Sequence, residues 1–89
     1  MNVEWEEDTL DRLADIYTAA DPADRDAIAV GVEQINAQLA TDPWNLGESR
    51  EPGRRVWFAH PLVIVFSLLP GGGVVVYHVA RLKGRPPTG

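Results

Sequence analysis

The sequence predicts an α+β domain, in which an N-terminal strand and a hairpin of two helices pack on an antiparallel sheet of three to four strands. Two observations support this class. Residues 8–42 carry apolar side chains at helical spacings, and residues 54–81 hold three runs rich in β-branched and aromatic residues. A short β-prone segment, residues 2–5, precedes the helices. The expected order is therefore β-α-α-β-β-β, and the expected architecture has two layers.

The first predicted helix begins near Asp8, which suits an N-cap position. Its apolar residues follow one another at spacings of three, three, one and three and form a single face: Leu10, Leu13, Ile16, Tyr17 and Ala20. The second helix begins at Asp21 and Pro22, a cap followed by the residue type favoured at the first helical position. Pro43 ends it. Because almost no residues separate the two helices, we expect an antiparallel hairpin.

The strand half begins after a loop, which we expect between Trp44 and Gly53. Residues 54–58 form the first strand, and a break at residues 59–61 makes His60 a turn residue. Residues 62–69 and 74–81 form the clearest strands, and the PGGG segment between them, residues 70–73, predicts a hairpin turn. One domain over residues 1–83 and a flexible tail over residues 84–89 account for the chain.

The two faces of this last hairpin can be separated by placing Leu69 opposite Val74. One face then carries bulky side chains that suit the helix layer: Leu62, Ile64, Phe66, Leu68, Val75, Tyr77 and Val79. The other face carries smaller ones: Val63, Val65, Ser67, Val76, His78 and Ala80. Two layers cover one face only, so we expect the second face to meet a partner through Val63, Val65 and Val76.

Composition limits the class of protein. The chain has 89 residues and no cysteine, which excludes a disulfide framework and thiolate metal sites. The longest apolar run, residues 62–69, is too short to cross a bilayer, and the first residues are acidic, unlike a signal peptide. We expect a cytoplasmic protein without a membrane association. The two histidines lack carboxylates at ligand spacing, so we expect neither a metal nor a cofactor.

Charge is strongly polarised along the chain. Eleven acids against two arginines give residues 1–47 a net charge of −9, whereas six basic residues against two acids give residues 48–89 a net charge of +4. Three arginines lie within the stretch GESREPGRRVWF, residues 47–58: Arg50, Arg54 and Arg55. Such clustering is typical of an anionic partner. The alternative is that these arginines form ion pairs with the acidic helices.

His78 also allows two interpretations. It is either a half-exposed histidine with a structural role or a general acid or base facing an anionic ligand. The register places it on the face opposite Arg81, the residue that closes the last strand.

The element order, the run INAQLATDPWNLGESR and the hairpin PLVIVFSLLPGGGVVVYHVAR together resemble the RelE/ParE superfamily, the toxins of type II toxin–antitoxin pairs. The resemblance covers about residues 3–83. It implies a cognate protein antitoxin and a target that is either mRNA on the ribosome or another molecule such as gyrase. A homodimer is a further expectation.

For RNA-cleaving members, the resemblance implies a metal-independent endoribonuclease in which basic residues hold the scissile phosphate. Arg81, His78 and Arg55 would be catalytic, and the RNA would be bound by Arg50, Arg54, Arg55 and Lys83. With about four to five phosphate contacts, binding to single-stranded RNA would weaken with salt at a logarithmic slope near −3. The alternative is a catalytically inactive protein-binding module. It is favoured by Val63, which lies near a position where the family carries arginine.

Overall fold

The computed structural model describes residues 2–46, 48–51 and 53–82, with residues 48–51 described in their backbone only. The elements follow one another along the chain as β1 (Val3–Trp5), α1 (Glu7–Ala19), α2 (Pro22–Thr41), the 3-10 turn η1 (Pro43–Asn45), β2 (Glu48–Glu51), β3 (Arg54–Ala59), β4 (Leu62–Leu68) and β5 (Val74–Arg81). The predicted tail, residues 84–89, lies outside the described residues.

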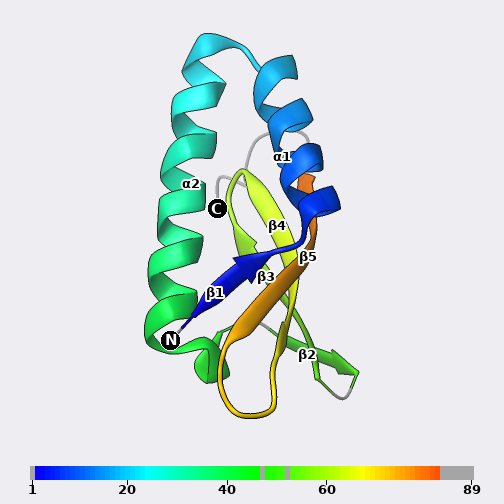
Figure 1. Cartoon of the computed structure of the whole chain (residues 1–89). Coiled ribbons are helices and arrows are strands. Elements are labelled where there is room, and N and C mark those ends of the chain that lie inside the picture. The colour runs from blue at the N-terminus through cyan, green and yellow to red at the C-terminus, as the bar shows by residue number, and fades with distance from the viewer. Residues whose placement is uncertain (1, 47, 52, 83–89) are drawn as a thin grey trace.

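The predicted α+β class is confirmed. α1 and α2 form a hairpin that packs against the sheet, with α1 on β5 and with α2 on β1 and β3 (Figure 1). α2 begins at Pro22 after Asp21, as the cap and proline predict. α1 begins at Glu7, with Glu6 as its N-cap, so the predicted start at Asp8 is slightly late. Neither Glu6 nor Asp21 makes a side-chain capping hydrogen bond. Glutamate is not among the residue types favoured at an N-cap, so a rule based on residue type misses the start of α1.

The sheet is larger than predicted. Within the described residues it has five strands in the order β1-β5-β4-β3-β2. β1 pairs with β5 in parallel, so the sheet is mixed rather than purely antiparallel. β2 lies in the segment predicted as a loop and pairs with β3. Its sequence, ESRE, has no apolar alternation, so the pattern that indicates a strand is missing there.

The β4–β5 hairpin follows the predicted register only at its open end. The register holds from the pair Leu62↔Arg81 to the pair Val65↔His78 and then shifts by one residue, so that Phe66 lies opposite Val76. The shift leaves Tyr77 as an additional residue on β5, which is a β-bulge. Beyond this bulge, each side chain of β5 therefore lies on the face opposite to the one that the unshifted register predicts.

This bulge corrects three placements. Val76 was expected on the open face, but it is 0% exposed and lies in the core together with Val74. Val75 and Tyr77 were expected under the helices, but they are half-buried on the other side of β5. The run VVVY has no feature that marks an extra residue, so alternation alone cannot locate the bulge.

The turn between β4 and β5 is the predicted PGGG hairpin. The amide of Leu69 donates to the carbonyl of Gly73 at 2.9 Å, and the amide of Gly72 donates to the carbonyl of Leu69 at 3.1 Å. Gly71, Gly72 and Gly73 all have positive φ, between 83° and 105°. Residues with a side chain rarely adopt this conformation, which explains the run of glycines.

The core lies between α2 and the helix side of the sheet. Its fully buried side chains come from α2 and from β4 and β5: Ile28, Ile35, Leu39, Leu62, Ile64, Phe66, Val74, Val76 and Val79. At its edge, the indole Nε1 of Trp5 donates to Oδ1 of Asn36 at 2.8 Å and ties β1 to α2. The opposite side of the sheet is covered by no helix in the described part of the chain (Figure 1).

Candidate functional site

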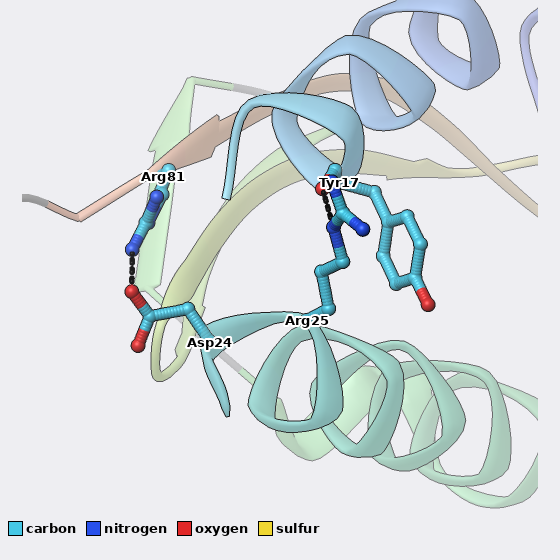
Figure 2. Close-up of polar contacts among 4 residues, drawn as sticks. All are labelled: Tyr17, Asp24, Arg25 and Arg81. Atoms are coloured by element: carbon cyan, nitrogen blue, oxygen red, sulfur yellow. Dashed lines mark hydrogen bonds and ion pairs between the residues drawn. The ribbon is translucent and has the colours of Figure 1, made fainter. Parts of the chain in front are cut away.

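Arg81 lies on the helix side of the sheet. It is opposite Leu62, whose side chain is in the core. Its Nη2 donates to Oδ2 of Asp24 at 2.8 Å, and the two groups form an ion pair (Figure 2). Asp24 is in the first turn of α2, where the helix dipole favours a carboxylate. The predicted phosphate-binding arginine therefore joins β5 to a helical acid.

His78 lies on the open side of the sheet, opposite Val65, and is exposed. The predicted separation of His78 and Arg81 onto opposite faces is confirmed. Side chains on opposite faces of one strand cannot contact the same phosphate, so this structure does not bring the two together at a single reaction centre.

Arg54 and Arg55 are neighbours on β3 and lie on opposite faces. Arg55 is opposite the buried Phe66, and its Nη1 donates to the carbonyl of Leu46 at 3.4 Å. Arg54 lies on the open face. Its Nε donates to the hydroxyl of Tyr77 at 2.6 Å, and its guanidinium carbon is 5.5 Å from the centre of that ring.

The three predicted catalytic residues are therefore dispersed. Arg55 and Arg81 share the helix side of the sheet, but their partners on β4 are Phe66 and Leu62, four residues apart. Four residues of strand span about 13 Å. His78 is on the other face. Of the predicted nucleic-acid contacts, Lys83 and the side chain of Arg50 lie outside the described residues.

The open face of the sheet is mainly apolar in its centre. Val63 and Val65 are half-buried there, next to Val56 and Phe58 of β3, and the Phe58 side chain is 56% exposed. Val76, the third predicted partner-binding residue, is in the core and cannot contact a partner at this face. Arg54 and His78 are the polar groups described above. This surface, the open sheet face, carries exposed apolar area that suits a partner.

A second apolar surface lies between the helices. A groove of about 420 Å³ is lined by eight residues, five from α1 and three from α2: Leu10, Leu13, Ala14, Tyr17, Thr18, Ile28, Ala29 and Val32. Leu10 is 49% exposed and Tyr17 is 44% exposed. We call this surface the interhelix groove.

Arg25 holds one end of the interhelix groove. Its Nε and Nη2 donate to the carbonyls of Tyr17 and Thr18 at 3.0 and 2.9 Å, at the C-terminal end of α1. Its guanidinium carbon lies 5.6 Å from the centre of the Tyr17 ring, and the arginine reaches up from α2 beside that ring (Figure 2). These contacts fix Tyr17 as a wall of the groove.

Sequence reasoning did not identify the interhelix groove. The spacing of the apolar residues from Leu10 to Ala20 predicted a single apolar face and did not show which part of it the sheet would cover. In the structure, Leu13 and Ile16 pack against the core, whereas Leu10 and Tyr17 remain exposed. The width of that apolar face is ordinary for a helix that packs on a core, so the sequence carried no signal for the exposed part.

The described residues contain no group of three or more histidine, cysteine, aspartate or glutamate side chains that could hold a metal ion. None of their helices combines the length and the apolarity that crossing a membrane requires.

Comparisons with known proteins identify a structural relative. The sequence matches no protein-family model and no curated protein. Among solved structures, a chain of the chromosomal ParDE TA system from P. aeruginosa has a similar fold, with a TM-score of 0.66 and 22% sequence identity. The similarity covers 93% of this chain and 97% of that chain. It confirms the fold implied by the RelE/ParE resemblance.

Proposed function

We propose that this protein is the toxin-like component of a type II toxin–antitoxin system and is bound and neutralised by a protein antitoxin. The observation that carries the proposal is the match of the fold, nearly end to end in both chains, to a chain of a ParDE TA system. A cytoplasmic location is part of this proposal.

Two apolar surfaces support binding to proteins. The interhelix groove exposes Leu10 and Tyr17, and the open sheet face exposes Phe58 beside Val63 and Val65. The surfaces lie on different sides of the molecule, since one is between the helices and the other is on the side of the sheet away from them. Two separate surfaces allow an antitoxin and a target to bind at different sites.

The dispersed arginines favour a protein target, such as gyrase, over RNA cleavage. Cleavage requires groups arranged around the charge that develops on one phosphate. Arg81 is engaged by Asp24, Arg55 is directed to the carbonyl of Leu46, and His78 is on the other face. Of the candidates with described side chains, Arg54 and His78 face the open side, and Arg54 contacts Tyr77.

A second candidate function is a binding module that has the same fold and no toxicity. The ion pair between Arg81 and Asp24 favours it, because that contact gives the arginine a structural role. Val63, in place of the arginine that the family carries nearby, favours it as well.

The test is induced expression in a bacterial host, in which growth and primer-extension cleavage of a reporter mRNA are followed. The wild type is compared with Arg81→Ala and with the double variant Arg54→Ala/Arg55→Ala. We expect growth arrest by the wild type without mRNA cleavage. Arrest with cleavage that either variant abolishes would instead support the ribonuclease. A soluble, folded wild-type protein that arrests nothing would refute the toxin assignment and leave the binding module.

A further inference from the structure

One row of residues across the open sheet face carries opposite charges at its two ends. The register pairs Glu4 with Val75, Val75 with Ser67, and Ser67 with Arg54, on the adjacent strands β1, β5, β4 and β3 (Figure 1). Both neighbours of Glu4 in β1 pack against the core, so Glu4 points away from the helices. Glu4 and Arg54 are exposed and lie three strand spacings apart, about 14 Å. The row is therefore acidic at β1 and basic at β3.

Arg54 is held in place at its end of this row. Its Nε donates to the hydroxyl of Tyr77 at 2.6 Å, and its guanidinium carbon lies 5.5 Å from the centre of that ring. Tyr77 is the additional residue that the bulge in β5 contributes. A guanidinium that already rests on a ring loses less freedom when it binds a carboxylate. The bulge therefore helps to orient a basic group on the open sheet face.

The row is complementary to its own reverse. A two-fold axis parallel to the strands, between β4 and β5, lays the row of one copy over the row of a second copy in the opposite order. Glu4 of each copy then lies over Arg54 of the other, and the interface gains two ion pairs. Packed sheets lie about 10 Å apart, a distance that a glutamate and an arginine span together. Symmetric dimers require this kind of self-complementary surface.

The same axis also brings apolar residues of the open sheet face together. Val63 is opposite Ala80 in one further row, and Val65 is opposite His78 in the next. Reversal lays Val63 of one copy over Ala80 of the other, and Val65 over His78. Phe58, which is 56% exposed, reaches the outer edge of β5 of the second copy. The arrangement therefore removes the most exposed apolar side chain of this face from water.

Other occupants fit this face less well. A polyanion would meet Glu4 at one end of the row and a chain with a net charge of −5. An unrelated protein would need the reversed charge pattern in its own sequence, whereas a second copy has it by symmetry. The face is small, about 14 Å across the strands and about 13 Å from Arg54 to Phe58. Surfaces of this size form weak complexes.

We propose that a second copy of this chain covers the open sheet face in a two-fold symmetric dimer, with Glu4 of each copy paired to Arg54 of the other. The dimer has a dissociation constant in the micromolar range. A target that binds the open sheet face must displace the second copy. This association goes beyond the proposed function and does not depend on it.

The experiment is sedimentation velocity of the full chain over a concentration series from micromolar to submillimolar. We expect a dimer that dissociates on dilution. Glu4→Arg and Arg54→Glu should each weaken it by at least about tenfold, because each change converts two attractive contacts into two repulsive ones. An equimolar mixture of the two variants, one of them fluorescently labelled, should form a heterodimer within about threefold of the wild-type affinity, since both charge pairs are then complementary again.

Charge reversals on the helices provide the matched controls. Glu33→Arg on α2 and Arg12→Glu on α1 are exposed and change the net charge by the same amounts, but they lie on the helix side of the sheet. Both should stay within about twofold of the wild-type dissociation constant. Circular dichroism checks that each variant is folded. If Arg54→Glu is not folded, because it loses the contact with Tyr77, the comparison of Glu4→Arg with Glu33→Arg decides.

Three results would overturn the proposal: a wild-type chain that stays monomeric at submillimolar concentration, a dimer that Glu4→Arg weakens no more than Glu33→Arg does, or two folded single variants that form no heterodimer. The growth assay under the proposed function does not measure self-association, so the two claims can fail separately. A dimer with these properties that arrests no growth would keep the assigned interface and lose the toxin assignment.

Discussion

The two helices of the hairpin contact the same sheet but are used differently. α2 buries Ile28, Ile35 and Leu39 almost completely. α1 buries only Thr9 to that extent and leaves Leu10 and Tyr17 about half exposed. Both helices present apolar residues at helical spacing, so apolar spacing alone does not show whether a face is covered.

We infer from this contrast that α2 is the scaffold of the fold and that α1 carries surface for a partner. A scaffold helix loses stability when its apolar residues are truncated, because a cavity remains. A helix that keeps apolar surface in water has less to lose and can gain by binding.

The largest effect is expected from matched truncations in the two helices. Ile35 is 0% exposed, so Ile35→Ala should lower the free energy of unfolding by about 2–5 kcal/mol. Leu10 is 49% exposed, so Leu10→Ala should cost less than about 1.5 kcal/mol. Urea denaturation measures both. Equal costs would contradict the assignment of α2 as the scaffold.

An intermediate effect is expected at Arg25, which joins the two helices. Arg25→Ala removes two hydrogen bonds and the contact with the Tyr17 ring, and should cost about 1–2 kcal/mol. Arg12→Ala, on the exposed surface of α1, is the control and should stay within about 0.5 kcal/mol of the wild type. Thermal unfolding monitored by circular dichroism distinguishes the two. An Arg25→Ala variant as stable as Arg12→Ala would show that α1 does not depend on this contact.

The smallest effect is expected from the ion pair between α2 and β5. The side chains of Arg81 and Asp24 are 35% and 49% exposed, so water screens the pair. A double-mutant cycle of Arg81→Ala and Asp24→Ala should give a coupling of about 0–1 kcal/mol. A coupling above about 2 kcal/mol would mean that the pair anchors β5 far more strongly than exposed pairs do.

Local signals explain what the sequence predicted well. Asp21 and Pro22 mark the start of α2, and the glycines after Pro70 mark the turn, because both depend on the conformational preferences of single residues. The α+β class followed from the change of apolar period between the two halves of the chain.

Non-local contacts explain what the sequence could not predict. The bulge at Tyr77 changes the face of Val76 without any local sequence mark. The partner of Arg81 is Asp24, 57 residues away, and no spacing rule joins them. The strand at Glu48–Glu51 is defined by its backbone pairing with β3, and its sequence shows no apolar alternation. The predicted site therefore needed more correction than the predicted fold.

We expect a protein partner to bind on the α1 side of the molecule. A direct measurement is amide hydrogen exchange of the chain alone and of its complex with a protein partner that co-purifies with the tagged chain from its source organism. We predict that added protection concentrates in residues 10–18 of α1, where partner contact suppresses local opening of a loosely packed helix. Protection confined to the open sheet face, or the absence of any protein partner that co-purifies with the chain, would contradict this expectation.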